Sequence, residues 1–427
     1  MSSNRVRQWL RAGAKIGVAG ALAACVYAGY RHYVEIRHDV AELIDGPGGQ
    51  GGGIRTEMAK DTPAAFLRAE KMLEEVLRIH ARNAFGIVAL SDVETQLVGW
   101  GFTDRSARAE DARGKADLKR VSFAELFDAH ALALLQEGRA AEAEAYARSL
   151  LQRYPAMSSV PRFHDLLGRA QRAQGNLTDA RASFRRAQES DWRQPRFIAD
   201  YAEALLEDGD AAVALAAFDR ALKANGDHIR SLIGKARAQI ALARDGRADV
   251  NAARAVLDAV LARSPQELTA EFRARALAAR AEARLLQKDV PGAAEDSAAA
   301  LALAPRLAPA LRARGMVDAA AGKSTAADEL LAAAAADRWD ASTYLDGAAA
   351  LEAAADLAGA RKLLEAHATA LAPTPRYHLA RAHLLTLAND PAGARAAAAE
   401  AAALEPASAI VRRADPAGQA THPQGRH

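Results

Sequence analysis

The chain has 427 residues, of which 50% are hydrophobic, 26% charged and only 5% aromatic, a composition that excludes a disordered polymer. Its 56 lysines and arginines nearly balance its 53 aspartates and glutamates, so we expect no nucleic-acid partner from overall charge. The single cysteine, Cys25, excludes a disulfide framework within the chain and a cysteine-built metal site.

Residues 1–44 carry the pattern of a membrane anchor or an export signal. Basic residues at positions 5, 7, 11 and 15 precede an uncharged stretch that ends at Tyr30. Residues 12–30 reach the roughly 20 residues that cross a bilayer, provided that Lys15 extends its charge to the interface. The excess of cations before this stretch predicts a cytoplasmic N-terminus. We therefore expect a bacterial inner-membrane helix, with the remainder of the chain facing the periplasm.

The same segment supports other interpretations. Leu22-Ala23-Ala24-Cys25 resembles the lipobox of bacterial lipoproteins, in which the cysteine is lipidated after cleavage. The residues that follow keep apolar side chains at Val34 and Val40, as a continued helix would. An uncleaved anchor, lipidation at Cys25 and cleavage after Ala23 therefore all remain open.

Residues 45–121 are predicted to form a linker followed by an atypical helical cap. The run Gly-Pro-Gly-Gly-Gln-Gly-Gly-Gly at 46–53 predicts a flexible linker over residues 45–61. Thr62 and Pro63 are suited to the N-cap and first position of a helix that ends near residue 82. A second helix is predicted at 87–98, and the charged stretch 104–120 is expected to be a loop. Together, residues 62–121 would cap the segment that follows.

A repeated unit begins near residue 122. A Gly or Asp turn is followed five residues later by an alanine, and in several copies a proline lies about twelve residues beyond that alanine. Intervals of 37, 34, 39, 40, 34, 33 and 34 residues separate the recurring alanines, which are Ala143, Ala180, Ala214, Ala253, Ala293, Ala327, Ala360 and Ala394. The high alanine content favours helix throughout.

This pattern resembles the tetratricopeptide repeat, a helix–turn–helix unit with a period of 34 residues. The resemblance implies an all-α, right-handed solenoid of about eight repeats over residues 122–406, preceded by the membrane helix. Small residues such as Gly168 would let helices approach, and Phe184 and Phe218 would fill the gaps between them. The two long intervals predict longer helices or loops near 244–250 and 266–272. The second helices would be ended by Pro155, Pro265, Pro305 and Pro406.

The remaining predictions concern the C-terminal tail and the catalytic and metal-binding motifs. Residues 407–427 are expected to be a disordered tail. No nucleophile motif, metal-ligand spacing or nucleotide-binding loop occurs in a suitable context, so we expect no catalytic residues, no metal, no cofactor and no small-molecule substrate.

The inner face of the solenoid is the candidate binding surface. Seven charged residues occupy its predicted inward positions, namely Arg162, Asp165, Arg169, Arg172, Arg196, Glu203 and Lys235. Their basic excess predicts a groove that holds an acidic peptide or a C-terminal carboxylate, and an ordinary solvated face is the alternative. Because a surface patch is expected, reversing the charge of Arg169 and Arg172 should leave folding intact.

The sequence thus predicts a membrane-tethered scaffold, not an enzyme, that binds an unidentified protein or an extended, acidic peptide. The alternative function is an envelope-assembly lipoprotein or chaperone subunit, of the outer-membrane or pilus type, that delivers or folds a client protein.

Overall fold

The computed structural model describes residues 38–47, 52–117, 124–156, 160–265, 267–366, 368 and 375–404. These ranges are built from helices and loops and contain no strand, so the predicted all-α class is confirmed. The predicted membrane segment 12–30, Cys25 and the tail 407–427 lie outside the described residues. Among the helices that are described, none combines the length and apolar character needed to cross a bilayer.

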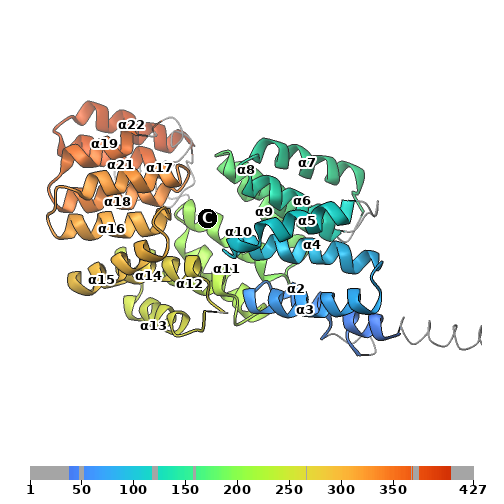
Figure 1. Ribbon diagram of the computed structural model, residues 1–427. Coiled ribbons are helices and arrows are strands. Elements are labelled where there is room, and N and C mark those ends of the chain that lie inside the picture. The colour runs from blue at the N-terminus through green and yellow to red at the C-terminus, as the bar shows by residue number, and fades with distance from the viewer. Residues whose placement is uncertain are drawn as a thin grey trace, which may run out of the picture.

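Among the described residues, the helices from α6 onward form eight pairs, which confirms the predicted repeat architecture. We number the pairs as repeats 1 to 8 and call their members the first and second helix. The pairs are α6 (Ala124–Gln136) with α7 (Ala140–Arg153), α8 (Val160–Ala173) with α9 (Leu177–Ser190), α10 (Pro195–Glu207) with α11 (Ala211–Ala224), α12 (Ile229–Arg244) with α13 (Val250–Leu261), α14 (Ala270–Leu286) with α15 (Val290–Leu303), α16 (Ala308–Ala320) with α17 (Ala326–Ala336), α18 (Ala341–Ala353) with α19 (Leu357–Glu365), and α21 (Pro375–Leu387) with α22 (Pro391–Leu404). Figure 1 shows them winding from α6–α8 on one side, through α10–α12, to α16–α22 on the other.

One turn geometry joins the two helices of every repeat. The second residue after each first helix has a positive φ, between 59° and 89°, at Gly138, Gly175, Gly209, Gly246, Lys288, Gly322, Ala355 and Asn389. The next N–H then bonds to a carbonyl five residues back, as from Asn176 to Gln171 at 2.9 Å. This is the hydrogen bond of a Schellman C-cap, so each first helix ends in the same way.

The left-handed turn predicts opposite effects for one substitution at two positions. Ala355→Gly should raise the free energy of unfolding by about 0.5–1 kcal/mol, because glycine has no Cβ to strain at φ 62°. Ala349→Gly, at an exposed position inside α18, should instead lower it by about 1 kcal/mol. Urea denaturation measures both, and equal effects would contradict the turn assignment.

Small residues allow the helices to approach, as predicted. A Cβ at Gly168 would lie 2.7 Å from the ring of Phe184, and one at Gly234 would lie 2.3 Å from the ring of Phe218. The recurring alanines are buried except Ala327 and Ala394, which are partly buried. Because glycine and alanine have small side chains, these helices bury apolar area by bringing their backbones close together.

Helix ends and lengths also follow the predictions. The second helices α7, α13 and α15 end shortly before Pro155, Pro265 and Pro305, whereas Pro406 lies outside the described residues. The two long intervals correspond to α12 and α14, which have 16 and 17 residues.

The N-terminal segment is more helical than predicted. It contains α2 (Ile54–Ala59), α3 (Pro63–Ile79), α4 (Ala84–Gly99) and α5 (Ser106–Asp117), and residues 38–45 are also helical. Thr62 caps α3 and Pro63 begins it, as predicted. The predicted linker differs because α2 buries Ile54 and Met58. The predicted loop at 104–120 differs because α5 buries alanines against α4, while its neighbouring arginines pair with buried glutamates.

The N-terminal helices pack against repeats 4 and 5 as well as repeat 1. Helix α4 lies against α6, as a cap for repeat 1 should. In addition, the ring of Trp100 lies 4.6 Å from that of Phe272, and the Thr269 hydroxyl donates to the Trp100 carbonyl at 2.7 Å. The ring of His228, buried between repeats 3 and 4, contacts Asp61 at 3.1 Å. These helices and repeats 4 and 5 therefore share one hydrophobic core.

Candidate functional site

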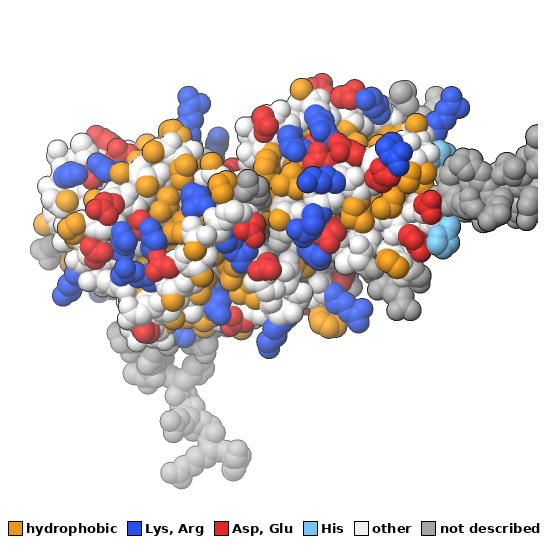
Figure 2. Space-filling view, turned by 60° about the horizontal axis from the view of Figure 1, so that its bottom comes forward, with side chains coloured by type: hydrophobic (Ala, Val, Ile, Leu, Met, Phe, Trp, Pro, Cys, Tyr) orange, Lys and Arg blue, Asp and Glu red, His pale blue; other side chains and the backbone are white. Residues whose placement is uncertain are grey.

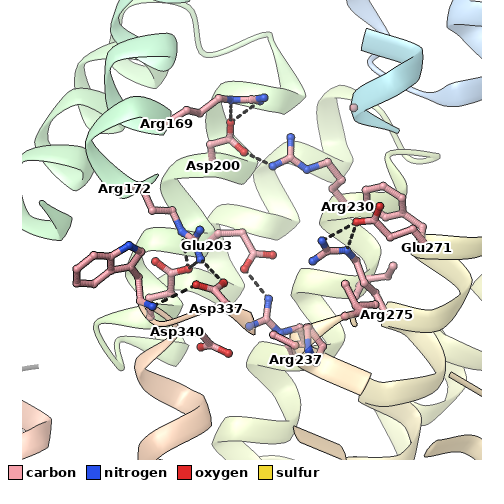
Figure 3. A pocket seen from close by; sticks show the side chains of 18 of the residues that line it. Arg169, Arg172, Asp200, Glu203, Arg230, Arg237, Glu271, Arg275, Asp337 and Asp340 are labelled. Atoms are coloured by element: carbon pink, nitrogen blue, oxygen red, sulfur yellow. Dashed lines mark hydrogen bonds and ion pairs between the residues drawn. The ribbon is translucent and has the colours of Figure 1, made fainter. Parts of the chain in front are cut away.

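A cavity of about 640 Å³ lies on the inner face of the solenoid. Its walls come mainly from the first helices of repeats 2 to 6 and from the loop before α18, with smaller parts from Leu132 of repeat 1 and from the N-terminal segment near Trp100 (Figure 3). Four aromatic residues, Trp100, Phe184, Phe272 and Trp339, contribute apolar surface. The remaining lining is dominated by charged side chains.

The charges that line the cavity are balanced. The lining includes seven arginines, which are Arg169, Arg172, Arg230, Arg237, Arg275, Arg306 and Arg312. It also includes seven carboxylates, which are Asp61, Asp200, Glu203, Glu207, Glu271, Asp337 and Asp340. Basic and acidic side chains are likewise interspersed on the face drawn in Figure 2. The basic excess predicted from the sequence is therefore not found in this cavity.

Most of these arginines pair with a carboxylate on a neighbouring first helix. Arg172 Nη2 lies 2.5 Å from Glu207 Oε1, and Arg237 Nη1 lies 2.6 Å from Glu203 Oε2. Arg169 contacts Asp200 at 2.6 Å. Each pair joins one repeat to the next, so the ion pairs run along the solenoid axis.

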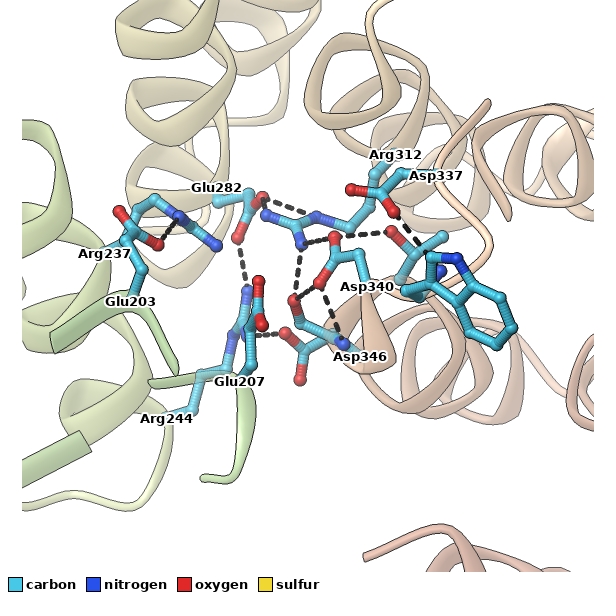
Figure 4. A network of polar contacts seen from close by, with 12 residues as sticks. Glu203, Glu207, Arg237, Arg244, Glu282, Arg312, Asp337, Asp340 and Asp346 are labelled. Carbon is cyan, nitrogen blue, oxygen red and sulfur yellow. Dashed lines mark hydrogen bonds and ion pairs between the residues drawn. The ribbon is translucent and has the colours of Figure 1, made fainter. Parts of the chain in front are cut away.

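A second set of ion pairs lies deeper, between repeats 4 and 7 (Figure 4). Arg312, with only 4% of its side chain exposed, contacts Glu282 at 2.7 Å and Asp340 at 3.0 Å. Arg244 contacts Glu282 at 2.6 Å and also pairs with Asp346. These contacts connect α12, α14, α16 and α18 in one network.

A third set occupies the inner face between α4 and α10. Arg162 contacts Asp128 at 3.1 Å, and Arg196 contacts Asp128 at 3.3 Å and Asp165 at 3.2 Å. Both acidic residues are buried. A buried carboxylate without a partner is costly, so these arginines are structural partners of Asp128 and Asp165.

Burial and arginine act in opposite directions on the buried carboxylates. Burial raises the pKa of Glu207 to about 7, although Arg172 favours the ionised form. Burial also opposes ionisation of Asp340, but Arg312 and Arg237 outweigh it and lower its pKa to about 2. The difference arises because Asp340 faces two arginines and accepts bonds from Ser342 and Thr343.

The structure separates the seven predicted binding residues into three groups. Arg169, Arg172 and Glu203 line the cavity. Arg162, Asp165 and Arg196 belong to the neighbouring set of buried ion pairs. Lys235 pairs with Asp219 of α11 at 2.8 Å and does not line the cavity.

Sequence reasoning missed the pairing partners, although the sequence contains a signal for them. Opposite charges recur about one repeat apart, as in Glu203 and Arg237, which are 34 residues apart, and Asp128 and Arg162, also 34 apart. Residues one repeat apart occupy equivalent positions on adjacent first helices. Searching for opposite charges at this spacing would have predicted the ion pairs.

The pairing overturns the expectation that charge reversal at Arg169 and Arg172 leaves folding intact. A glutamate at either position would face Asp200 or Glu207 at close range, leaving carboxylates without a cation. Each single reversal should lower the free energy of unfolding by about 2–3 kcal/mol, less than for a fully buried pair. Arg220→Glu, at an exposed position on α11, is the control and should change it by no more than about 0.5 kcal/mol. Equal stability of the three variants in urea denaturation would show that the ion pairs contribute nothing.

No family model and no curated protein matches the chain. Among solved structures, the APC/C hetero-tetramer Cut9–Hcn1 is 16% identical, with 94% of this chain and 82% of that chain covered and a TM-score of 0.46. The human IFIT1 dimer with m7Gppp-AAAA is 15% identical, with 88% of each chain covered and a TM-score of 0.46. A tetratricopeptide repeat protein from Parabacteroides merdae is 15% identical, with 68% of this chain and 96% of that chain covered and a TM-score of 0.36. Similarities this weak assign neither a family nor a function to the chain. Its repeat architecture is established by its own helix pairs.

Proposed function

We propose that the chain is a membrane-tethered scaffold whose cavity binds a protein partner through an extended segment. The observation that supports this is the cavity itself, which draws most of its lining from five consecutive first helices. Its volume of about 640 Å³ lies within the ~300–1,000 Å³ typical of ligand pockets. Such a lining offers polar contacts to successive residues of an extended partner segment.

The ion pairs leave donors and acceptors for a bound segment. A guanidinium has five N–H donors, and the ion pairs of Arg172 and Arg275 use only some of them while their side chains stay 34% and 39% exposed. Arg306 lines the cavity, is exposed, and has no ion-pair partner among the described residues. Carboxylates of a partner would bind these donors, and backbone N–H groups would bind Glu203 and Glu271.

The tether in this proposal rests on residues 12–30 and their basic flank. Val40, which precedes the glycine run in the sequence, is buried in the same core as Ile54, which follows it. Ten residues separate Tyr30 from Val40 and span at most about 35 Å when extended. The proposed anchor would therefore hold the solenoid close to the membrane surface, on the periplasmic side.

Site-specific photocrosslinking tests the proposed binding site. A photoreactive amino acid at position 306 of the full-length chain should crosslink a defined partner in intact cells, because Arg306 lines the cavity. The same amino acid at position 220, on the outer helix α11, should not crosslink that partner. Crosslinks from 220 but not from 306 would move the binding site to the outer surface.

A reporter fusion tests the proposed location. An enzyme that is active only outside the cytoplasm, fused after His427, should be active. Replacing Arg5, Arg7 and Arg11 with glutamate should reduce that activity, because the cation bias sets the orientation. A well-expressed but inactive fusion to the unmodified chain would place the solenoid in the cytoplasm.

A further inference from the structure

Two parts of the solenoid that are far apart in sequence meet at the rim of the cavity. The indole Nε1–H of Trp339, in the loop before α18, donates to the carbonyl oxygen of Ala173 at 3.1 Å. The indole also lies against Gly175, where an added Cβ would come within 2.5 Å of the ring. These residues lie in repeat 2 and between repeats 6 and 7, so the contact closes the solenoid on itself.

Charged side chains join the same two parts. Arg172 bonds to Glu207 in repeat 3 and also lies 3.4 Å from Asp337, in the loop that carries Trp339 (Figure 3). One repeat further along, an added Cβ at Gly209 would lie 2.5 Å from Arg376, at the start of α21. The turns of repeats 2 and 3 thus face the beginnings of the first helices of repeats 7 and 8.

This closure differs in kind from the rest of the packing. Among the repeats, helices that pack along one another belong to the same repeat or to adjacent repeats, and ion pairs such as that of Arg244 with Asp346 make the longer connections. Across the closure, no described helix of repeats 2 and 3 packs along a helix of repeats 6 to 8. The contact consists of side chains from the loop before α18 and from the ends of α8 and α21, and Trp339 and Asp337 are only partly buried.

We propose that Trp339, Asp337, Arg172, Ala173 and Gly175 form a latch that opens and closes the rim of the cavity. On one side, ion pairs such as Arg169 with Asp200 join repeats 2 and 3. On the other side, Arg312 joins repeats 5 and 6 to the loop before α18. Separation at the latch therefore breaks few contacts and leaves the repeats intact. Arg172, Ala173, Asp337 and Trp339 also line the cavity. This inference rests on the proposed function. If the cavity binds a partner, the partner enters when the latch opens.

Gly175 provides a matched test, because another turn glycine has the same backbone conformation without the indole. Both Gly175 and Gly138 have a positive φ, of 86° and 76°, so alanine introduces similar strain at each. Only at Gly175 does the added Cβ meet Trp339, since nothing lies within 4 Å at Gly138. The difference between Gly175→Ala and Gly138→Ala therefore isolates the latch.

The experiment measures the separation of the two sides by single-molecule energy transfer. Dyes are placed at two exposed positions, through Arg185→Cys on α9 and Lys362→Cys on α19, in the full-length chain carrying Cys25→Ser. Gly175→Ala and Trp339→Ala should lower the transfer efficiency, whereas Gly138→Ala and Trp192→Ala should not change it. Trp192 is a suitable control because it occupies a loop between repeats and is 65% exposed.

Two outcomes would overturn the latch. The first is unchanged transfer in both Gly175→Ala and Trp339→Ala with helical circular dichroism retained. The second is an equal loss of transfer in Gly138→Ala, which would assign the effect to turn strain. If Trp339→Ala loses its helical signal, the comparison of the two glycine variants decides the question. Because no partner is used, the result is independent of whether the cavity binds one.

Discussion

Pairing of opposite charges between adjacent first helices is the constraint on which the inner face depends. Many of the closest contacts between helices involve alanine and glycine, which bury little area and distinguish poorly between alternative alignments. Sliding one helix by a turn would leave residues such as Asp128 or Glu282 buried without a cation. Since breaking a buried pair costs ~3–5 kcal/mol, the ion pairs penalise every alignment except the observed one. They act mainly on the alignment of repeats and less on net stability.

The N-terminal helices add large apolar side chains to the core of the central repeats. Residues such as Phe66, Leu73 and Trp100 are buried in a core that also contains Ile229 and Phe272 of repeats 4 and 5. This core includes residues of α12 and α14, which are the two longest first helices. The extra length of these two helices gives the N-terminal helices a surface to pack against. The irregular part of the chain is therefore also the part with the most apolar packing.

Much of the repeat architecture could be predicted from the sequence, because its signals are local. Glycine turns, prolines and small residues mark helix ends and contacts within about 40 residues of chain. The turn residues Lys288 and Ala355 could not be recognised, because their left-handed conformation is imposed by the repeat rather than by their type. The contact of Trp339 with Ala173 spans 166 residues, and no periodic pattern specifies it. Helix α5 was missed because its apolar face consists of alanines only.

Closure of the solenoid also bears on how the chain folds. An open repeat array behaves as a one-dimensional system, in which each unit responds only to its neighbours and the ends fray first. Contacts between repeats 2 and 7 link distant units, as do those of the N-terminal helices with repeats 4 and 5. Such long-range links raise the contact order, which slows folding, and they make neighbouring units lose structure together. The central repeats should therefore unfold as one cooperative block, which extends to repeat 7 through Trp339 and to the start of repeat 8 through Arg376.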